Sequence, residues 1–180
     1  MKVIEVTLDD NYLIAKRSKD IDYLDVFQME TTSFDKPIAP KDCMIAFFKS
    51  FPSFFTKMLL FRESVARFIG LKTAPKTSEE EREKKINEFQ GDVGDSIAIF
   101  EVLDRNETEL LTGQKDKHLD FLFSFISYQK ENNHIIELAT TVVIHNFLGR
   151  VYFFFVRPVH RIYMKRIMKR MVKELLKTKA

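Results

Sequence analysis

Alternating apolar and polar positions predict several β-strands, and the clearest case is the stretch His118–Phe125. Its odd positions, 119, 121, 123 and 125, are all apolar, whereas Asp120 and Ser124 share the other face. Successive side chains of a strand point to opposite faces, so the odd positions form the buried face. The same test on 96–103 and 137–145 places Glu101 and Glu137 outside. It predicts these inward residues: Ala98, Phe100, Val102, Ile136, Leu138, Thr140, Val142 and Ile144.

Shorter patterns predict the other elements. Asp22–Met29 alternates and is rich in aromatic and β-branched residues, which predicts the first main strand. Helical spacing between Pro52 and Gly70 predicts a helix there. Further predictions are a short strand at Val3–Val6, a helical turn at Tyr12–Lys16, a helix at Asp42–Lys49, a mobile loop with about one helical turn at Thr73–Gly94, a turn at Asp104–Asn106 and a strand at Glu109–Thr112.

The last third of the chain predicts one long helix that lies on the sheet. Its apolar residues recur at steps of three and four, the spacing of one helix face. They are Met164, Ile167, Met168, Met171, Val172 and Leu175. Four earlier residues continue the spacing: Val151, Phe155, Val159 and Ile162. Residues 151–156 could also form a buried strand, with Pro158 starting the helix. We favour one helix that begins near Gly149, includes Pro158 and turns this whole stripe toward the sheet.

The order of elements is one strand, a helical pair, several antiparallel strands and a closing helix, which is an α+β arrangement. A chain of 180 residues with 45% apolar residues is near the usual size of one domain. We expect a single domain over residues 1–180, with its core at about 20–176. Met1–Asp10 holds no apolar run long enough for a signal peptide or a spanning helix, which predicts a cytoplasmic protein.

Charge and aromatic content add two features. Residues 157–180 hold nine Lys or Arg against the single acid Glu174, a net charge of +8 in a chain that totals +3. This segment could attract phosphates or an anionic membrane, or form a solvated helix face. The 18 Phe residues cluster at 47–61, 121–125 and 153–155 and fill a core or line a cavity. Their inward positions argue against a nucleic-acid partner.

Asp116, His118 and Asp120 are the first candidates for chemistry. They alternate along one strand face, about 7 Å apart, and could orient a general base, bind a metal, or face solvent or the second subunit of a homodimer. The single Cys43 allows neither an intramolecular disulfide nor a thiolate cluster. Two Asp and one His lack the further ligands that transition metals usually take, so we expect no metal. No phosphate-loop motif is present, and we expect no cofactor.

A second polar group, His145, Arg150 and His160, surrounds the predicted entry to the last helix. If that entry forms the mouth of a cavity, Arg150 or Arg157 could pair with a carboxylate or phosphate on an otherwise apolar ligand. Helix capping and the ordinary polarity of strand ends are the alternative explanation of these residues.

Several segments together resemble an uncharacterised bacterial family, a domain of unknown function grouped with the START-like or SRPBCC superfamily. They are Asp22–Phe27, Phe68–Thr73, Asp116–Phe121, Asn146–Arg150 and Arg157–Arg161, and the resemblance spans roughly residues 20–176. It implies a helix-grip fold, in which a curved antiparallel sheet wraps around a long C-terminal helix and often leaves an apolar cavity. The family has no established activity, so no functional residue carries over.

Three functions are compatible with these patterns. The leading hypothesis is a non-enzymatic module that binds a small hydrophobic or lipid-like molecule between the sheet and the last helix. Its ligand-binding residues would be Phe100, Phe121, Phe123, Phe125, Val142, Ile144, Arg150 and Arg157. The second is a cyclase- or hydratase-type enzyme that uses His118 with Asp116 or Asp120. The third is a protein- or membrane-surface module that uses the basic last helix, with peripheral membrane contact.

Overall fold

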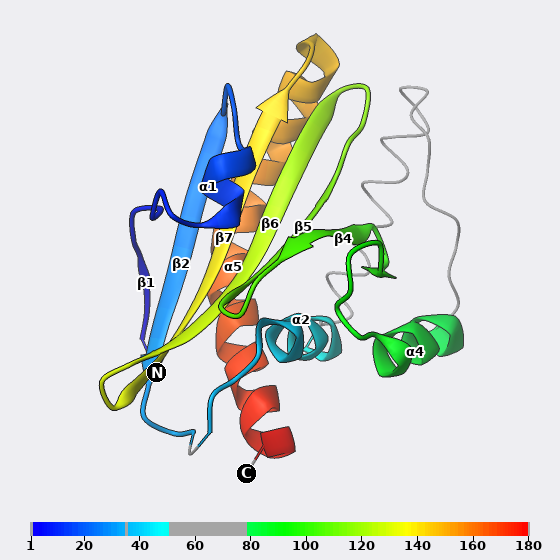
Figure 1. The fold of residues 1–180 in the computed structure, drawn as a ribbon. Coiled ribbons are helices and arrows are strands. Elements are labelled where there is room, and N and C mark those ends of the chain that lie inside the picture. Colours follow the sequence, from blue (N-terminus) through cyan, green and yellow to red (C-terminus); the bar gives the residue numbers. More distant parts are fainter. Residues whose placement is uncertain (1, 35, 51–78, 180) are drawn as a thin grey trace.

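The computed structural model describes residues 2–34, 36–50 and 79–179. These residues form a curved, antiparallel, seven-stranded sheet in the order β1-β2-β7-β6-β5-β4-β3 (Figure 1). The strands are β1 (Val3–Glu5), β2 (Tyr23–Thr31), β3 (Ser96–Ile97), β4 (Phe100–Arg105), β5 (Glu109–Gln114), β6 (Leu119–Lys130) and β7 (Asn133–Ile144). The helices are α1 (Leu13–Arg17), α2 (Pro40–Lys49), α4 (Glu79–Glu88) and α5 (Phe147–Lys179). The predicted α+β arrangement with a long C-terminal helix is confirmed.

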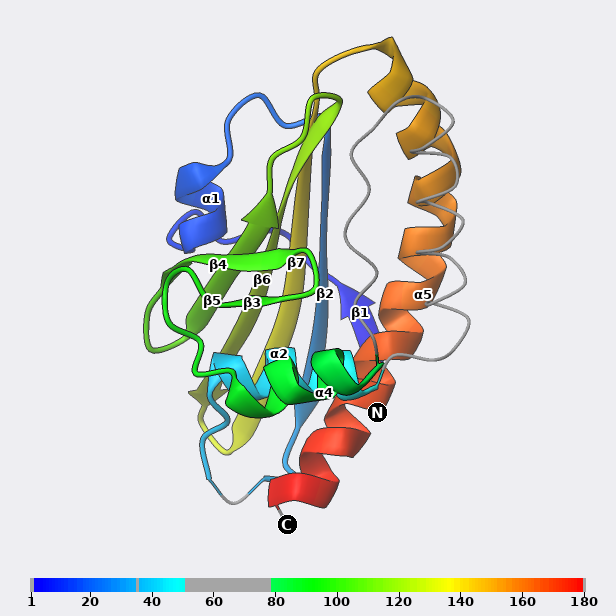
Figure 2. The ribbon, with the colours of Figure 1, turned by 90° about the vertical axis from the view of Figure 1, so that its right-hand side faces the viewer.

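The centre of the sheet is the hairpin of β6 and β7, two strands of 12 residues each. They pair along their whole length, from Leu119 opposite Ile144 to Lys130 opposite Asn133. We call the face against which α2 and α5 pack the inner face, and the face that carries α1 the outer face. Figure 2 shows α5 and α1 on these opposite sides of the sheet.

The inner face buries the main hydrophobic core. The predicted stripe of α5, from Met164 to Leu175, is buried throughout, which confirms that this half of the helix lies on the core. Helix α2 adds Phe47, whose ring lies 5.5 Å from that of Phe123 and 5.4 Å from that of Phe125. Burial of each such ring stabilises the fold by roughly 2–3 kcal/mol. The inward residues of β6 therefore pack against two helices.

The first half of α5 presents a different side from the one predicted. The helix begins at Phe147 and includes Pro158, as expected. However, Val151, Phe155 and Ile162 are 42%, 62% and 56% exposed, so they do not face the sheet. The side of the helix that holds the buried Met164 carries instead His160 and Phe153, four and eleven positions earlier. The buried stripe and the exposed apolar residues belong to two different helix faces.

Two other local predictions were wrong. The stretch 96–103 is a hairpin rather than one strand, with Ala98 in the turn between β3 and β4. Ala98 has a φ of 55° and an exposed side chain, so it does not face inward. The predicted loop at 73–94 contains the helix α4, because Ile86 packs into the main core and gives this charged segment an apolar anchor. The helix predicted between Pro52 and Gly70 lies outside the described residues.

The outer face is covered, although its polar residues were expected to meet water or a second subunit. Glu137, Ser124 and Thr141 do point to this face, yet all three are buried. The Thr141 hydroxyl lies 2.9 Å from that of Ser18, and the carboxylate of Glu137 accepts a hydrogen bond of 2.9 Å from Tyr12. Residues before β2 thus close over this part of the sheet.

Glu109 joins α1 to the sheet. Its buried carboxylate accepts hydrogen bonds from the backbone N–H groups of Leu13 (2.5 Å) and Ile14 (2.9 Å) and from the hydroxyl of Ser124 (2.6 Å). The first N–H groups of a helix have no acceptor within the helix. The residue before α1, Tyr12, provides no side-chain cap, so Glu109 caps α1 from the sheet.

We expect Glu109→Gln to destabilise the protein by about 3 kcal/mol, because the amide turns an N–H group toward buried donors and leaves them unsatisfied. Urea unfolding followed by circular dichroism measures this free energy. Glu107→Gln, in the exposed turn before β5, is the matched control and should change it by less than about 0.5 kcal/mol. Equal effects of the two substitutions would contradict the capping role of Glu109.

Glu137 makes stability depend on pH. Burial raises the pKa of its carboxyl above the ordinary value of 4.5, although hydrogen bonds from Tyr12 and Tyr128 oppose the shift. The native state then holds this proton more tightly than the unfolded chain does. The resulting contribution to stability is present below pH 4.5 and is lost as the pH rises through the raised pKa.

The free energy of unfolding of the wild type, minus that of Glu137→Gln, should therefore fall as the pH rises from about 4 to about 7. Urea titrations at several pH values measure the difference, with the exposed Glu131→Gln as control. A difference that stays constant or grows with pH would contradict the raised pKa of Glu137.

Candidate functional site

A carboxylate lies on the inner face of the sheet, among apolar residues. Strand β2 turns Tyr23, Asp25 and Phe27 to this face, and all three are buried. Asp25 is 2% exposed, and its register partner on β7 is Thr140. A buried acid in the middle of an apolar strand face is costly unless it is hydrogen-bonded. Its partners therefore indicate what it does.

Asp25 is paired with a histidine of α5. Its Oδ2 atom accepts a hydrogen bond of 2.5 Å from the hydroxyl of Tyr23 and lies 3.2 Å from Nε2 of His160. The same Nε2 atom is 3.3 Å from Oγ1 of Thr140. The other carboxylate oxygen, Oδ1, is buried and has no hydrogen-bond partner within the described residues. We call Asp25 and His160 the Asp25–His160 pair.

Aromatic rings surround the pair. The ring of Phe153 meets that of Tyr23 edge to face at 5.0 Å, and the His160 ring does so at 6.1 Å. The guanidinium of Arg157 lies 5.4 Å from the centre of the Tyr23 ring. Burial, together with the hydrogen bond to Asp25, raises the pKa of Tyr23, so its hydroxyl stays protonated and acts as the donor.

The arrangement can accept a hydrogen bond from a further group. Both protein donors converge on Oδ2 of Asp25, which leaves Oδ1 to accept from a hydroxyl or an amine. The contact with the carboxylate also orients the imidazole of His160, as carboxylates do in many histidine sites. Among the described residues, no cluster of His, Cys, Asp and Glu side chains could hold a metal ion.

The aromatic residues predicted to bind a ligand divide into two groups. Phe123 and Phe125 are 3% and 0% exposed and pack against Phe47, so they belong to the filled core. Phe100 and Phe121 are only partly buried, with ring centres 5.3 Å apart.

The remaining predicted residues lie in the second half of β7 and the first half of α5. Val142 is buried opposite Tyr23 in the register of the sheet, and Ile144 is partly buried at the end of β7. Arg150 and Arg157 are exposed on α5, and Arg157 lies against the Tyr23 ring.

The histidines predicted to gather at the helix entry are separated. His145 Nε2 pairs with Asp120 at 3.1 Å, whereas His160 pairs with Asp25. The polar group of His145, Arg150 and His160 is therefore not one site. Asp25 and Thr140 were missed as site residues, although the acid at an apolar position of the strand 22–29 was the available signal.

His118 takes part in capping α5. Its Nδ1 atom lies 2.9 Å from Oδ1 of Asn146, and the same oxygen accepts a hydrogen bond of 3.1 Å from the backbone N–H of Gly149. The amide nitrogen of Asn146 donates to the carbonyl of Lys117 at 3.0 Å. Asn146 thus closes the first turn of the helix. These contacts favour a structural role for His118 over the acid–base role.

Asp116 and Asp120, which the sequence analysis grouped with His118, lie at the same junction between β6 and the start of α5. The carboxylate of Asp120 accepts a hydrogen bond of 3.0 Å from the backbone N–H of Asp116 and pairs with His145. Two of the segments that carry the family resemblance, Asp116–Phe121 and Asn146–Arg150, therefore meet here.

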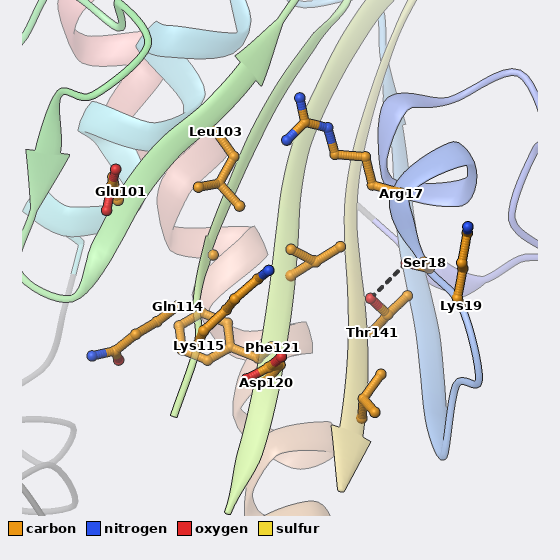
Figure 3. A pocket seen from close by; sticks show the side chains of 13 residues that line it. Arg17, Ser18, Lys19, Glu101, Leu103, Gln114, Lys115, Asp120, Phe121 and Thr141 are labelled. Carbon is orange, nitrogen blue, oxygen red and sulfur yellow. Dashed lines mark hydrogen bonds between the residues drawn. The ribbon is translucent and has the colours of Figure 1, made fainter. Parts of the chain in front are cut away.

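A separate hollow of about 630 Å³ lies on the outer face (Figure 3). Arg17 and Lys19, at the end of α1, stand on one side of it, and Leu103 and Lys115 lie toward the other. Arg17 is already paired with Asp104 at 2.9 Å. The sheet lies between this hollow and the Asp25–His160 pair, and Phe121 of β6, whose ring packs against Phe100, also borders the hollow.

The fold and the site define an α+β protein whose antiparallel sheet holds a carboxylate–imidazole pair beneath a long C-terminal helix. Residues 17–167 match the family described as a protein of unknown function (DUF2867), and the chain belongs to that family. The match includes Asp25 and His160, and it confirms the predicted domain of unknown function. The START-like relationship stays a prediction. No curated protein and no solved structure matches the chain.

We expect Gly149→Ala to destabilise the protein by about 2–3 kcal/mol, because an added Cβ would overlap the carbonyl oxygen of His118 and push the start of α5 away from β6. Urea unfolding measures the loss. Arg150→Ala, at the next and exposed position, should change stability by less than about 0.5 kcal/mol. If both alanines were tolerated equally, the close contact of α5 with His118 would not be a constraint.

Proposed function

We propose that this protein binds a small hydrophobic or amphipathic molecule between the inner face of the sheet and the first half of α5, in a START-like helix-grip arrangement. The observation that carries the proposal is the Asp25–His160 pair, whose buried Oδ1 atom has no partner within the described residues. Ligand sites typically combine an apolar wall with a few converging polar groups.

The apolar wall would come from residues around the pair rather than from the filled core. Phe100, Phe121, Val142 and Ile144 line the inner face beyond Phe123. Phe153 of α5 would extend this wall beside Tyr23, with which its ring is in edge-to-face contact. An apolar chain of the ligand would be stabilised by the water-exposed area that it loses against these side chains.

The polar end of the ligand would reach Asp25. A hydroxyl or amine that donates to Oδ1 would remove the cost of a buried acceptor without a donor. Arg157 and Arg150 would lie at the rim, where they could attract an acidic group on the same molecule. The proposed ligand is therefore an apolar molecule that carries at least one hydrogen-bond donor.

A matched pair of probes tests this proposal: 1-decanol, which donates a hydrogen bond, and decyl methyl ether, which does not. Their affinities are measured by displacement of the fluorescent dye 1-anilinonaphthalene-8-sulfonate. We expect the wild type to prefer the alcohol by about tenfold, because a donor that satisfies the buried Oδ1 atom is worth about 1.5 kcal/mol.

The variant Asp25→Leu removes the acceptor and puts an apolar side chain of similar size in its place. It should bind both probes with similar affinity, while Glu101→Gln, at an exposed position of β4, should behave as the wild type. Equal affinities for both probes in the wild type would show that Asp25 does not hold the polar end. Failure of both probes to displace the dye would contradict an apolar site altogether.

A further inference from the structure

The first half of α5 carries apolar side chains on its solvent side. Phe147, Phe154 and Phe155 are 76%, 73% and 62% exposed. With them we define the α5 stripe, which consists of Phe147, Leu148, Val151, Phe154, Phe155 and Ile162. Soluble proteins rarely leave a contiguous apolar patch of several large side chains in water without a partner.

The α5 stripe lies opposite the side of the helix that faces the sheet. Gly149, Phe153 and His160 mark the inward side through their neighbours His118, Tyr23 and Asp25. With 100° of rotation per residue, Val151 and Ile162 fall on the far side of the helix axis. Figure 2 shows α5 running along one side of the molecule, with the sheet on its other side. The inner-face contacts therefore do not cover the stripe.

The same solvent side becomes basic after Ile162. Lys165, Lys169 and Lys173 continue its direction at steps of four residues and are exposed, although the ammonium of Lys165 turns back to lie 5.5 Å from the centre of the Phe27 ring. Lys169 and Lys173 have no acidic partner among the described residues. One ridge of α5 therefore consists of an aromatic half followed by a cationic half.

From this ridge we infer that α5 docks on an anionic membrane surface, with the aromatic rings of the stripe inserted at the interface and the lysines against lipid head groups. Helices of this kind combine an apolar face with Lys and Arg, and they lie in the plane of the membrane. Among the described residues, no helix is long and apolar enough to cross a bilayer, so surface binding is the mode that fits. The ridge faces away from the Asp25–His160 pair, so the two sites are separate.

Charge complementarity favours a membrane over a second copy of the chain. Residues 157–180 carry nine Lys or Arg against one Glu, and a parallel pairing of two such helices would bring the two basic segments close together. An antiparallel pairing through the stripe would leave the lysine half of each ridge outside the contact, so neither pairing uses the whole ridge. Anionic lipids would instead neutralise the same charges. A second copy remains an outcome that the experiment can detect.

Co-sedimentation with vesicles tests the inference on the full chain. One set of vesicles is phosphatidylcholine alone, and the other contains about 30% phosphatidylserine, a typical anionic lipid. We expect binding to the anionic vesicles at least about tenfold tighter than to the neutral ones, and a loss of that difference near 0.5 M salt because exposed charges are screened. Binding that is absent, or equal on both lipids, would overturn the inference.

Substitutions separate the two halves of the ridge. Phe154→Ser with Phe155→Ser should weaken binding to anionic vesicles by about tenfold or more, and Lys169→Glu with Lys173→Glu should abolish the preference for phosphatidylserine. All four residues are exposed, so the variants should keep the stability of the wild type. The matched control is Leu24→Ser, which removes an exposed apolar residue of β2 and should leave binding unchanged.

Analytical ultracentrifugation decides about the second copy. We expect a monomer without vesicles. A dimer that dissociates when Phe154 and Phe155 are replaced would mean that the stripe is a subunit interface, and it would overturn the membrane assignment. Equal loss of vesicle binding in the Leu24→Ser control would overturn it as well, because the effect would then not depend on the stripe.

Discussion

The position of α5 depends on its attachment at two points. At its start, Asn146 closes the first turn while its side chain contacts His118 and the carbonyl of Lys117, so the helix is tied to the residues just before β6. In its second half, the stripe from Met164 to Leu175 is buried in the core. Because α5 is attached at two points, its orientation about its own axis is fixed. That rotation places His160 against Asp25 and turns Phe154 to the solvent.

The two faces of the sheet treat buried carboxylates differently. On the outer face, Glu109 accepts hydrogen bonds from three donors and Glu137 from two tyrosines. On the inner face, the donors of Asp25 converge on one oxygen, and the other has no partner within the described residues. Because an apolar residue at this position would cost the fold less, packing alone does not account for Asp25. The outer carboxylates, in contrast, are explained by the attachment of α1 and of the residues before it.

Local periodicity predicted the elements well where one face of an element is buried and the other polar. The alternation of 118–125 placed Phe123 and Phe125 on the inner face, and both are buried there. Prediction failed where a segment from elsewhere in the chain decides the environment. Ser124 and Thr141 read as outward residues, yet α1 and the residues next to it cover them. The hydroxyl of Thr141, for example, pairs with Ser18, more than 100 positions away, and no local pattern contains that partner.

By itself, the sequence determined the α+β class, the antiparallel strands and the long basic last helix, because the periods of two and 3.6 residues are properties of neighbouring positions. The tertiary structure alone decided which side of α5 is inward. Val151 and Ile162 repeat at the same steps as the buried stripe but about half a turn away from it, and the contacts at Gly149 and Met164 decided which of these two apolar faces is inward. The tertiary structure also brought Asp25 next to His160, because their pairing depends on the register of β2 on β7 and on the orientation of α5, which are fixed far from both residues.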